Sequence, residues 1–125
     1  MDRTDLVVLA VDDDKINRML LKSMLKKSGI VKEIVEAENG SDAIDALKSR
    51  DDIDLVLLDI IMPIMSGLEM LQVAREDSNL RQVPIIMLTT DETKKGEALE
   101  LGANDFLMKP IRKDELIAKI NNIIV

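Results

Sequence analysis

The sequence predicts an α/β fold, built as a doubly wound, five-stranded parallel sheet with five helices. Strand-like apolar runs alternate five times with segments of helical periodicity, a pattern typical of a parallel sheet covered by helices on both faces. The first, third and fourth runs are the most apolar, so we expect them to be central, with the second and fifth at the edges. The strand order 2-1-3-4-5 meets this condition.

The five strands are expected where apolar runs are bounded by polar residues. Four of the runs stop directly at a polar side chain: Leu6–Val11 before Asp12, Leu55–Leu58 before Asp59, Ile85–Leu88 before Thr89, and Phe106–Met108 before Lys109. The more polar stretch Glu33–Glu38 is the expected second strand, at an edge. The order 2-1-3-4-5 is the flavodoxin-like one, and its switch point lies between the first and third strands.

The helices are justified by apolar spacing and by residues that begin or end a helix. The first has an apolar stripe and ends at Gly29, a usual left-handed cap; the stripe is Ile16, Met19, Leu20, Met24 and Leu25. A second helix is expected over 41–49, and the capping box of Ser66 and Glu69 opens a third. A fourth is expected over 92–101, and the last has its inner face on Leu116, Ile117, Ile120, Ile123 and Ile124.

Composition limits the chemistry of the chain. Its 125 residues are expected to form a single domain over 1–125, and 46% of them are hydrophobic, enough for a real core. Cysteine and histidine are absent, which excludes disulfides, zinc–thiolate sites and imidazole chemistry. The net charge of -7 argues against direct nucleic-acid binding and suits local acidic clusters that bind a cation.

The ends and the hydropathy of the chain favour a cytoplasmic location. The charged start Met1–Asp5 leads directly into the first strand and is unlike a signal peptide. The longest apolar stretch is far short of a membrane span, so no membrane attachment is expected. The sequence leaves open whether the chain stands alone or is a domain of a longer regulator.

The polar residues that follow the strands are expected to meet at one edge of the sheet. Parallel strands end at the same edge, so Asp12, Asp13, Asp59, Thr89 and Lys109 would lie together. Mg²⁺ prefers oxygen ligands, usually one or two carboxylates with waters and phosphate. Asp13 and Asp59 would supply carboxylates, and Asp12 would hold a bound water. Four strand ends agree, which favours a cation site over acids that merely complement a helix dipole.

The same residues suit phosphoryl transfer. A carboxylate beside a metal can attack phosphorus and carry the phosphoryl group, while the metal offsets the charge. Lys109 can pair with one phosphoryl oxygen and Thr89 can donate a hydrogen bond to another. Each of these two residues alone is better explained as an ordinary strand-end residue. Together with Asp59 they indicate a phosphate site.

Four blocks of sequence carry a resemblance to a known family. They are Val11-Asp12-Asp13, Leu57–Pro63, Met87–Thr90 and Gly102–Pro110. In this order and at these spacings they resemble the response-regulator receiver domain of two-component signalling, of the chemotaxis-response-regulator kind, over essentially the whole chain. The resemblance implies that Asp59 accepts a phosphoryl group from a phosphohistidine of a sensor histidine kinase or a histidine phosphotransfer protein.

The resemblance also implies a metal site. Asp12, Asp13 and Asp59 would bind Mg²⁺, with Mn²⁺ as an alternative, helped by the main-chain carbonyl of Ile61. The chain would catalyse only its own phosphotransfer and autodephosphorylation, so we do not expect a conventional enzyme.

A switch is implied as well. Thr89 matches the switch hydroxyl, Lys109 the phosphate-pairing lysine, and Phe106 the aromatic residue that changes rotamer on activation. Phosphorylation would then change the surface formed by the fourth helix, the fifth strand and the fifth helix. That surface would meet a downstream effector domain or target protein, or a second copy in a phosphorylation-linked homodimer.

Some positions depart from the family pattern. Phe106 is often a tyrosine, so its inward state here depends on packing alone. Thr90 stands where a smaller residue is common, which would restrict access to the phosphate, and Ser66 replaces a frequent aspartate. Ile61 and Asp91 flank the expected phosphate, and the apolar Ile61 cannot orient an attacking water, which bears on the lifetime of the phosphoryl group.

Three other functions agree less well with these residues. A haloacid-dehalogenase-type phosphatase with Asp59 as nucleophile would need an aspartate two residues later, where the chain has Ile61. A flavin or nucleotide module lacks support, because no Gly-rich loop follows the first strand and Phe106 is the one aromatic residue. A pseudo-receiver that binds partners without phosphorylation fits poorly with the complete set of acids, threonine and lysine.

Two local features give further predictions. Lys109-Pro110 is expected to be a cis peptide, because the chain must turn sharply to point Lys109 into the site. Gly96 lies inside the expected fourth helix, where glycine costs roughly 1 kcal/mol relative to alanine. We therefore expect this helix to be a weak, bistable element, unless Gly96 only makes room for a neighbouring side chain.

Overall fold

Five parallel strands form a sheet in the predicted order β2-β1-β3-β4-β5. The computed structural model describes residues 4–124, so the charged residues 1–3 used in predicting location lie outside it. The strands are β1 (Leu6–Val11), β2 (Val31–Ala37), β3 (Leu55–Asp59), β4 (Ile85–Thr89) and β5 (Asp105–Met108). Every residue of β1, β3 and β4 is buried, whereas β2 is largely half-exposed or exposed, as expected for central and edge strands.

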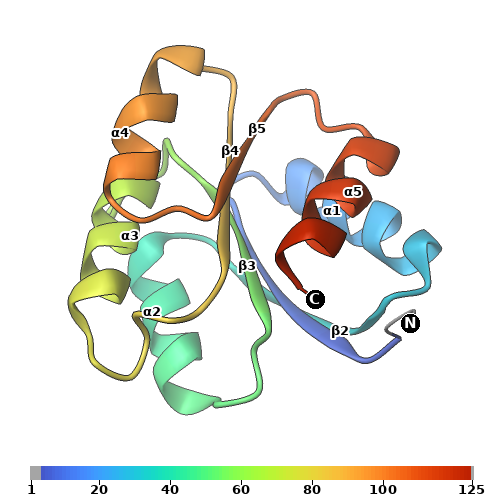
Figure 1. Cartoon of the computed structure of the whole chain (residues 1–125), viewed down its shortest axis with the longest axis horizontal. Coiled ribbons are helices and arrows are strands. Elements are labelled where there is room, and N and C mark those ends of the chain that lie inside the picture. The colour runs from blue at the N-terminus through green and yellow to red at the C-terminus, as the bar shows by residue number, and fades with distance from the viewer. Residues whose placement is uncertain (1–3, 125) are drawn as a thin grey trace.

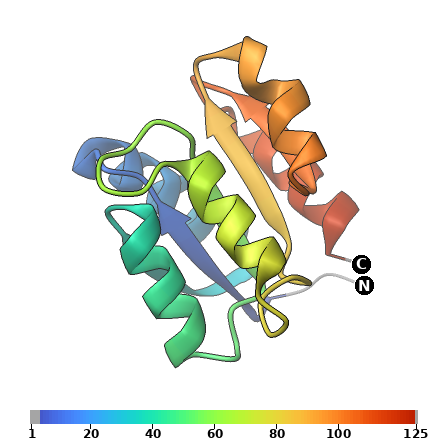
Figure 2. The ribbon, with the colours of Figure 1, turned by 90° about the vertical axis from the view of Figure 1, so that its left-hand side faces the viewer.

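Helices cover both faces of the sheet (Figure 1). One face carries α1 (Lys15–Ser28) and α5 (Lys113–Ile123), and the other carries α2 (Gly40–Ser49), α3 (Gly67–Glu76) and α4 (Lys95–Glu100). Figure 2 shows the last three in front of the sheet. Because side chains alternate along a strand, β1 sends Leu9 and Val11 into one core cluster and Leu6, Val8 and Ala10 into the other.

The helix ends confirm most of the predicted signals. Gly29 caps α1 with a φ of 77°, and Ser66 and Glu69 form the capping box of α3. The peptide bond Lys109-Pro110 is cis, as predicted. The predicted fourth helix is divided: a 3-10 helix, η1 (Glu92–Lys94), leads into the six-residue α4.

The apolar stripe noted for α1 faces the sheet at its C-terminal end only, where Leu25 is buried and Met24 packs against the core. Ile16, Met19 and Leu20 are exposed, with 63%, 54% and 55% of their surface accessible. The buried residues of α1 are Arg18, Leu21 and Leu25. Arginine therefore occupies a position on the inward face, at the spacing of the two leucines. The helix is turned so that its most apolar residues near the N-terminus face solvent.

The last helix packs largely as predicted, with Leu116 and Ile120 of α5 buried. The other predicted inner residues of α5 are partly buried and pack against the same core cluster: Ile117, Ile123 and Ile124. In α2 the buried side chains are Ala43, Ile44 and Leu47. Within residues 4–124, no helix is both long enough and apolar enough to cross a membrane.

Candidate functional site

Asp12 is the first residue after β1 and is held from several sides. Its side chain is 1% exposed, and its backbone N–H donates to the carbonyl of Ala37 at 3.1 Å. One carboxylate oxygen, Oδ1, accepts a hydrogen bond from the N–H of Asp14 at 2.9 Å. Asp14 in turn caps α1 by accepting from the N–H of Ile16 at 2.8 Å. The end of β1 and the start of α1 thus form one hydrogen-bonded unit around the Asp12 carboxylate.

Asp59 is the last residue of β3 and lies beside Asp12, as the strand order predicted. It is buried, whereas Asp13 is exposed. Asp12, Asp13 and Asp59 each offer a carboxylate oxygen, and these three oxygens all lie within 4.8 Å of one another. The structure therefore brings the predicted acids together at the carboxyl ends of β1 and β3.

Gly67 allows α3 to begin directly against Asp59. The N–H of Gly67 donates to the carbonyl of Ile60 at 2.7 Å. A Cβ at position 67 would overlap the carbonyl oxygen of Asp59 and lie 2.8 Å from the Cα of Ile60. Only glycine fits this close approach without a backbone shift. The capping box located the start of α3, but the close approach could not be recognised from one sequence.

Lys109 reaches into the acidic group from the end of β5. Its Nζ lies 2.9 Å from Oδ2 of Asp12 and 3.2 Å from Oδ1 of Asp59. Its backbone N–H donates to the carbonyl of Thr89 at 2.8 Å, which ties the ends of β4 and β5 together. The side chain is 17% exposed, so these ion pairs are partly shielded from water.

Thr89 ends β4 at this edge, and Phe106 lies further back, on the neighbouring strand β5. Thr89 is 1% exposed, and its hydroxyl oxygen accepts a hydrogen bond from the N–H of Asp91 at 3.2 Å. This bond does not use the hydroxyl proton. Phe106 pairs in register with Met87 and is 5% exposed. The Phe106 ring is therefore already buried in this structure. The rotamer change expected for Phe106 on activation stays a prediction.

The flanking residues lie at the rim. Ile61 is 66% exposed, and Thr90 is also exposed. Ser66 caps α3, as serine does well in place of aspartate. Asp91 caps η1 by accepting from the N–H of Thr93 at 3.0 Å. The metal-ligand role predicted for the Ile61 carbonyl stays a prediction.

The pKa values of Asp59 and Lys109 are both raised, for different reasons. Burial raises the pKa of Asp59; the Lys109 charge opposes this, and the Asp12 charge adds to it. For Lys109, burial lowers the pKa, but the hydrogen bond to Asp12 and the charge of Asp59 outweigh it and leave the pKa raised. Lys109 thus stays an ammonium, and one ammonium does not fully compensate three crowded carboxylates.

The donor set fits a hard divalent cation. Three carboxylates and one ammonium leave two negative charges at the site. Carboxylate oxygens from one or two residues, completed by water and phosphate, are the ligands that Mg²⁺ takes in proteins. The exposed Asp13 leaves one side of the group open to solvent, where a phosphoryl group could enter.

Comparison with known proteins assigns the family. Residues 8–121 match the response regulator receiver domain. The chain belongs to this family. The transcriptional regulatory protein CpxR of Escherichia coli (strain K12) is 40% identical over 119 residues, covering 94% of this chain and 48% of CpxR. The chain thus spans about half the length of this relative.

Solved receivers share the architecture. The chemotaxis response regulator CheY4 of Vibrio cholerae has a TM-score of 0.86 at 31% identity, with 97% of this chain and 100% of that chain covered. The receiver domain of the sensor histidine kinase PA1611 from Pseudomonas aeruginosa PAO1 has a TM-score of 0.84 at 27% identity, covering 94% of this chain and 95% of that one. That structure has a magnesium ion coordinated in its active-site cleft. Receiver domains are signalling proteins and not conventional enzymes.

One buried residue of this receiver was not singled out from the sequence. Arg18 of α1 is 7% exposed, and its Nη1 donates to the main-chain carbonyl of Asp12 at 2.6 Å. Arg18 falls three and seven residues before Leu21 and Leu25 on the inward face of the helix, but the spacing alone does not say which face is inward. An arginine at such a position needs a partner, and the carbonyl it binds belongs to a candidate site residue.

Proposed function

We propose that Asp59 is the phosphoacceptor of this receiver and that its phosphorylation depends on Mg²⁺. The donor would be a phosphohistidine of a sensor histidine kinase or a histidine phosphotransfer protein. The observation that carries the proposal is the position of the Asp59 carboxylate, at the end of a central strand and within 4.8 Å of two further carboxylates. The ammonium of Lys109 contacts the same carboxylate at 3.2 Å.

The chemistry follows from the groups at this edge. An Asp59 carboxylate oxygen attacks phosphorus, an O–P bond forms, and the N–P bond of the donor imidazole breaks. Attack requires the ionised carboxylate, which Lys109 supports by hydrogen bonding and charge. Mg²⁺, when held by Asp12, Asp13 and Asp59 with the Ile61 carbonyl, would offset negative charge on the attacking and transferred oxygens. Mn²⁺ would serve as a substitute with the same ligands.

The buried residues behind the site would read the new phosphoryl group. The Lys109 ammonium would leave the Asp59 carboxylate and pair with a phosphoryl oxygen. The Thr89 hydroxyl would donate its proton to another oxygen, and the chain after Thr89 leads directly into η1 and α4. Movement of Thr89 would therefore alter the surface formed by α4, β5 and α5.

The partners follow from the family and its relatives. The surface of α4, β5 and α5 would contact a downstream effector domain or target protein, or a second copy of the chain in a homodimer. CpxR, of which this chain covers 48%, is a transcriptional regulatory protein by name. We place this receiver in the cytoplasm, in a system where a kinase supplies the phosphoryl group and the receiver hydrolyses it.

The test is labelling with acetyl phosphate, followed by intact mass. The wild-type chain should gain one phosphoryl group with Mg²⁺ and none with EDTA, and Asp59→Asn should gain none. Asp14→Asn is a matched control, because Asp14 lies next to Asp13 but caps α1 instead of joining the acidic group. It should be labelled like the wild type. Equal labelling of wild type and Asp59→Asn would refute the assignment.

A further inference from the structure

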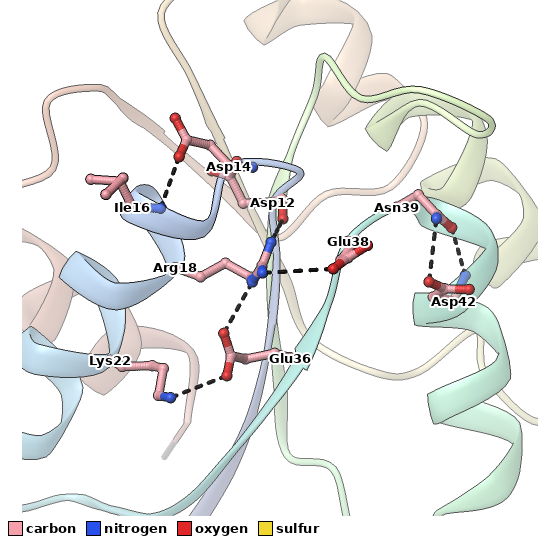
Figure 3. Close-up of polar contacts among 9 residues, drawn as sticks. All are labelled: Asp12, Asp14, Ile16, Arg18, Lys22, Glu36, Glu38, Asn39 and Asp42. Carbon is pink, nitrogen blue, oxygen red and sulfur yellow. Dashed lines mark hydrogen bonds and ion pairs between the residues drawn. The ribbon is translucent and has the colours of Figure 1, made fainter.

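Arg18 is a buried cation that links three elements beside the site. It lies on α1, its side chain is 9% exposed, and it points toward the end of β1 and the edge strand β2 (Figure 3). Nη1 donates to the main-chain carbonyl of Asp12 at 2.6 Å, and Nε donates to Oε1 of Glu36 at 3.0 Å. Nη2 lies 3.9 Å from Oε1 of Glu38. The planar guanidinium thus holds a carbonyl and a carboxylate in fixed relative positions.

Glu36 anchors this guanidinium to β2. Its second carboxylate oxygen accepts a hydrogen bond from Nζ of Lys22, one turn along α1, at 3.1 Å. The hydrogen bond from Lys22 lowers the pKa of Glu36; burial opposes the shift and the hydrogen bond from Arg18 supports it. Glu36 therefore stays ionised at neutral pH and keeps its ion pair with Arg18, whose side chain is 9% exposed.

The carbonyl that Arg18 holds belongs to the peptide group between Asp12 and Asp13. The peptide group is planar, so a hydrogen bond that fixes the direction of the Asp12 carbonyl also fixes the orientation of the plane. That plane contains the N and Cα atoms of Asp13. The other polar atoms of Asp12 are also engaged, by Ala37, Asp14 and Lys109. Arg18 is thus the contact that sets the plane leading to Asp13, the exposed carboxylate of the acidic group.

We propose that Arg18 is a positioning residue for divalent-cation binding. It holds the Asp12–Asp13 peptide so that the Asp13 carboxylate stays within reach of Asp12 and Asp59. This inference rests on the proposed function, because it assigns to Arg18 a part in forming the Mg²⁺ site.

A positioning role and a purely electrostatic role of Arg18 predict opposite effects of its removal on Mg²⁺ affinity. A cation near the acidic group repels a dication, so if Arg18 acted only through its charge, removing it would strengthen Mg²⁺ binding. If Arg18 acts by holding the peptide, removing it weakens binding. Arg18→Lys keeps the charge but loses the planar fork that reaches both the Asp12 carbonyl and Glu36. The positioning role therefore predicts that Arg18→Lys and Arg18→Met are impaired alike.

The experiment is Mg²⁺ titration by calorimetry, paired with the Mg²⁺ dependence of acetyl phosphate labelling. Arg18→Met and Arg18→Lys should bind Mg²⁺ about tenfold more weakly, at the lower end of the effect of losing an outer contact to a metal ligand. Half-maximal labelling should need about tenfold more Mg²⁺. Labelling at saturating Mg²⁺ should stay within about twofold of wild type, because Asp59 and Lys109 are untouched.

Two controls separate positioning from general loss of stability. Arg50 also forms ion pairs with two acidic residues, Glu33 and Asp52, but it lies away from the site. Arg50→Met should therefore leave Mg²⁺ affinity unchanged. Lys22→Met removes the other partner of Glu36 and should change Mg²⁺ affinity much less than Arg18→Met. Thermal unfolding with EDTA identifies a temperature at which each variant is folded, and if Arg18→Met does not fold, Arg18→Lys carries the test.

The outcomes are distinct from those of the proposed function. If the wild type neither binds Mg²⁺ nor labels at Asp59, the proposed function fails. If the wild type does both and the Arg18 variants bind Mg²⁺ as tightly as wild type or more tightly, the positioning role is overturned. A fall in maximal labelling rate with no change in the Mg²⁺ requirement would also overturn it.

Discussion

Asp59 carries a charge that the folded, metal-free chain disfavours. Burial raises its pKa, and the nearby Asp12 charge adds to the effect, while Lys109 only partly compensates. A bound cation or a phosphoryl group at Asp59 would change the charge of this site, where the carboxylates repel one another. Binding of a cation should relieve this repulsion and so stabilise the folded chain.

The raised pKa of Asp59 predicts a pH-dependent effect of neutralising it. The folded chain binds the Asp59 proton more tightly than the unfolded chain does, so this group lowers stability as pH rises above the unfolded pKa. Asp59→Asn should therefore raise the free energy of unfolding at pH 7 in EDTA. The gain should shrink as the pH falls through the usual carboxyl range near ~4. Urea unfolding at both pH values measures it.

Asp52 is the control of opposite sign for this experiment. A hydrogen bond from Arg50 lowers the pKa of Asp52, so its ionised form is favoured in the fold. Asp52→Asn should not stabilise the chain at pH 7. Mg²⁺ at 100 times its Kd should stabilise the wild type by about 2.7 kcal/mol and have little effect on Asp59→Asn. A stabilised Asp52→Asn, or an Asp59→Asn that loses stability in EDTA, would contradict this account.

Lys109→Met should separate metal binding from phosphoryl chemistry. The substitution removes an ammonium that lies 2.9 Å from Asp12 and 3.2 Å from Asp59, so Mg²⁺ should bind with equal or greater affinity. The rate of labelling by acetyl phosphate should fall by about 10²–10³-fold, the usual cost of losing one electrostatic contact to a transition state. Calorimetry and intact mass measure the two effects, and lost Mg²⁺ affinity would show that the role of Lys109 is misassigned.

At the residue scale, the polar residues at strand ends were predicted from the sequence, but the residues whose contacts hold them in place were not. Asp12, Asp59 and Lys109 could be placed because parallel strands end at one edge, and the structure brings them together. Arg18 and Gly67 act through main-chain carbonyls of site residues. Such contacts depend on the rotation of a helix and on a close backbone approach, and neither is encoded in hydropathy or spacing alone.

At the scale of elements, α3 and α4 use glycine for different reasons. Gly67 opens α3 where a side chain would overlap the Asp59 carbonyl. Gly96 lies in α4, and a Cβ added there would meet nothing within 4 Å, so this glycine does not make room for a neighbour. The packing explanation of Gly96 is therefore wrong, and the bistability of this helix stays a prediction. A helix of six residues, preceded by a 3-10 turn, has little intrinsic stability of its own.

Two glycine-to-alanine substitutions test this difference. Gly96→Ala should stabilise the chain by about 0.4–1 kcal/mol, because alanine fits the open position and favours helix. Gly67→Ala should destabilise it by about 1–3 kcal/mol or more, through overlap with the backbone at Asp59 and Ile60. Chemical unfolding of both variants measures the contrast. A neutral Gly67→Ala would show that α3 can shift freely away from the phosphoacceptor strand.

Helix α1 shows where prediction at the scale of elements fails. Its existence and its cap at Gly29 were confirmed, and Leu25 of its apolar stripe is buried, but Ile16, Met19 and Leu20 of the same stripe are exposed. Periodicity indicates a helix with an apolar face, and it does not say whether that face meets the sheet or solvent. In this helix the inward face carries the buried Arg18 beside Leu21 and Leu25.

At the scale of the whole molecule, the strand order was predictable because burial and topology agree. The three most apolar runs are the central strands, and their carboxyl ends form the site edge. The signal should leave on the other side of β4, through η1, α4 and β5. These elements connect Thr89, at the site edge, with Phe106, in the core cluster that contains Ala98 of α4.

Hydrogen exchange should reveal this route. Beryllofluoride with Mg²⁺ mimics the phosphoryl group, and at saturation it should change exchange protection in residues 91–108 of the wild type. The same residues should be unaffected in Asp59→Asn, and Gly96→Ala should show higher protection in α4 before beryllofluoride is added. Unchanged protection over 91–108 with Asp59 saturated would place the output elsewhere on the surface.

The central claim is that Asp59 itself carries the phosphoryl group, and mapping the acyl phosphate tests it most directly. The chain is labelled with acetyl phosphate and Mg²⁺, reduced with borohydride, digested and sequenced by tandem mass spectrometry. Reduction converts an aspartyl phosphate to homoserine, so the account predicts homoserine at position 59 and aspartate at positions 12 and 13. Homoserine at another aspartate, or labelled protein with intact aspartate at position 59, would contradict it.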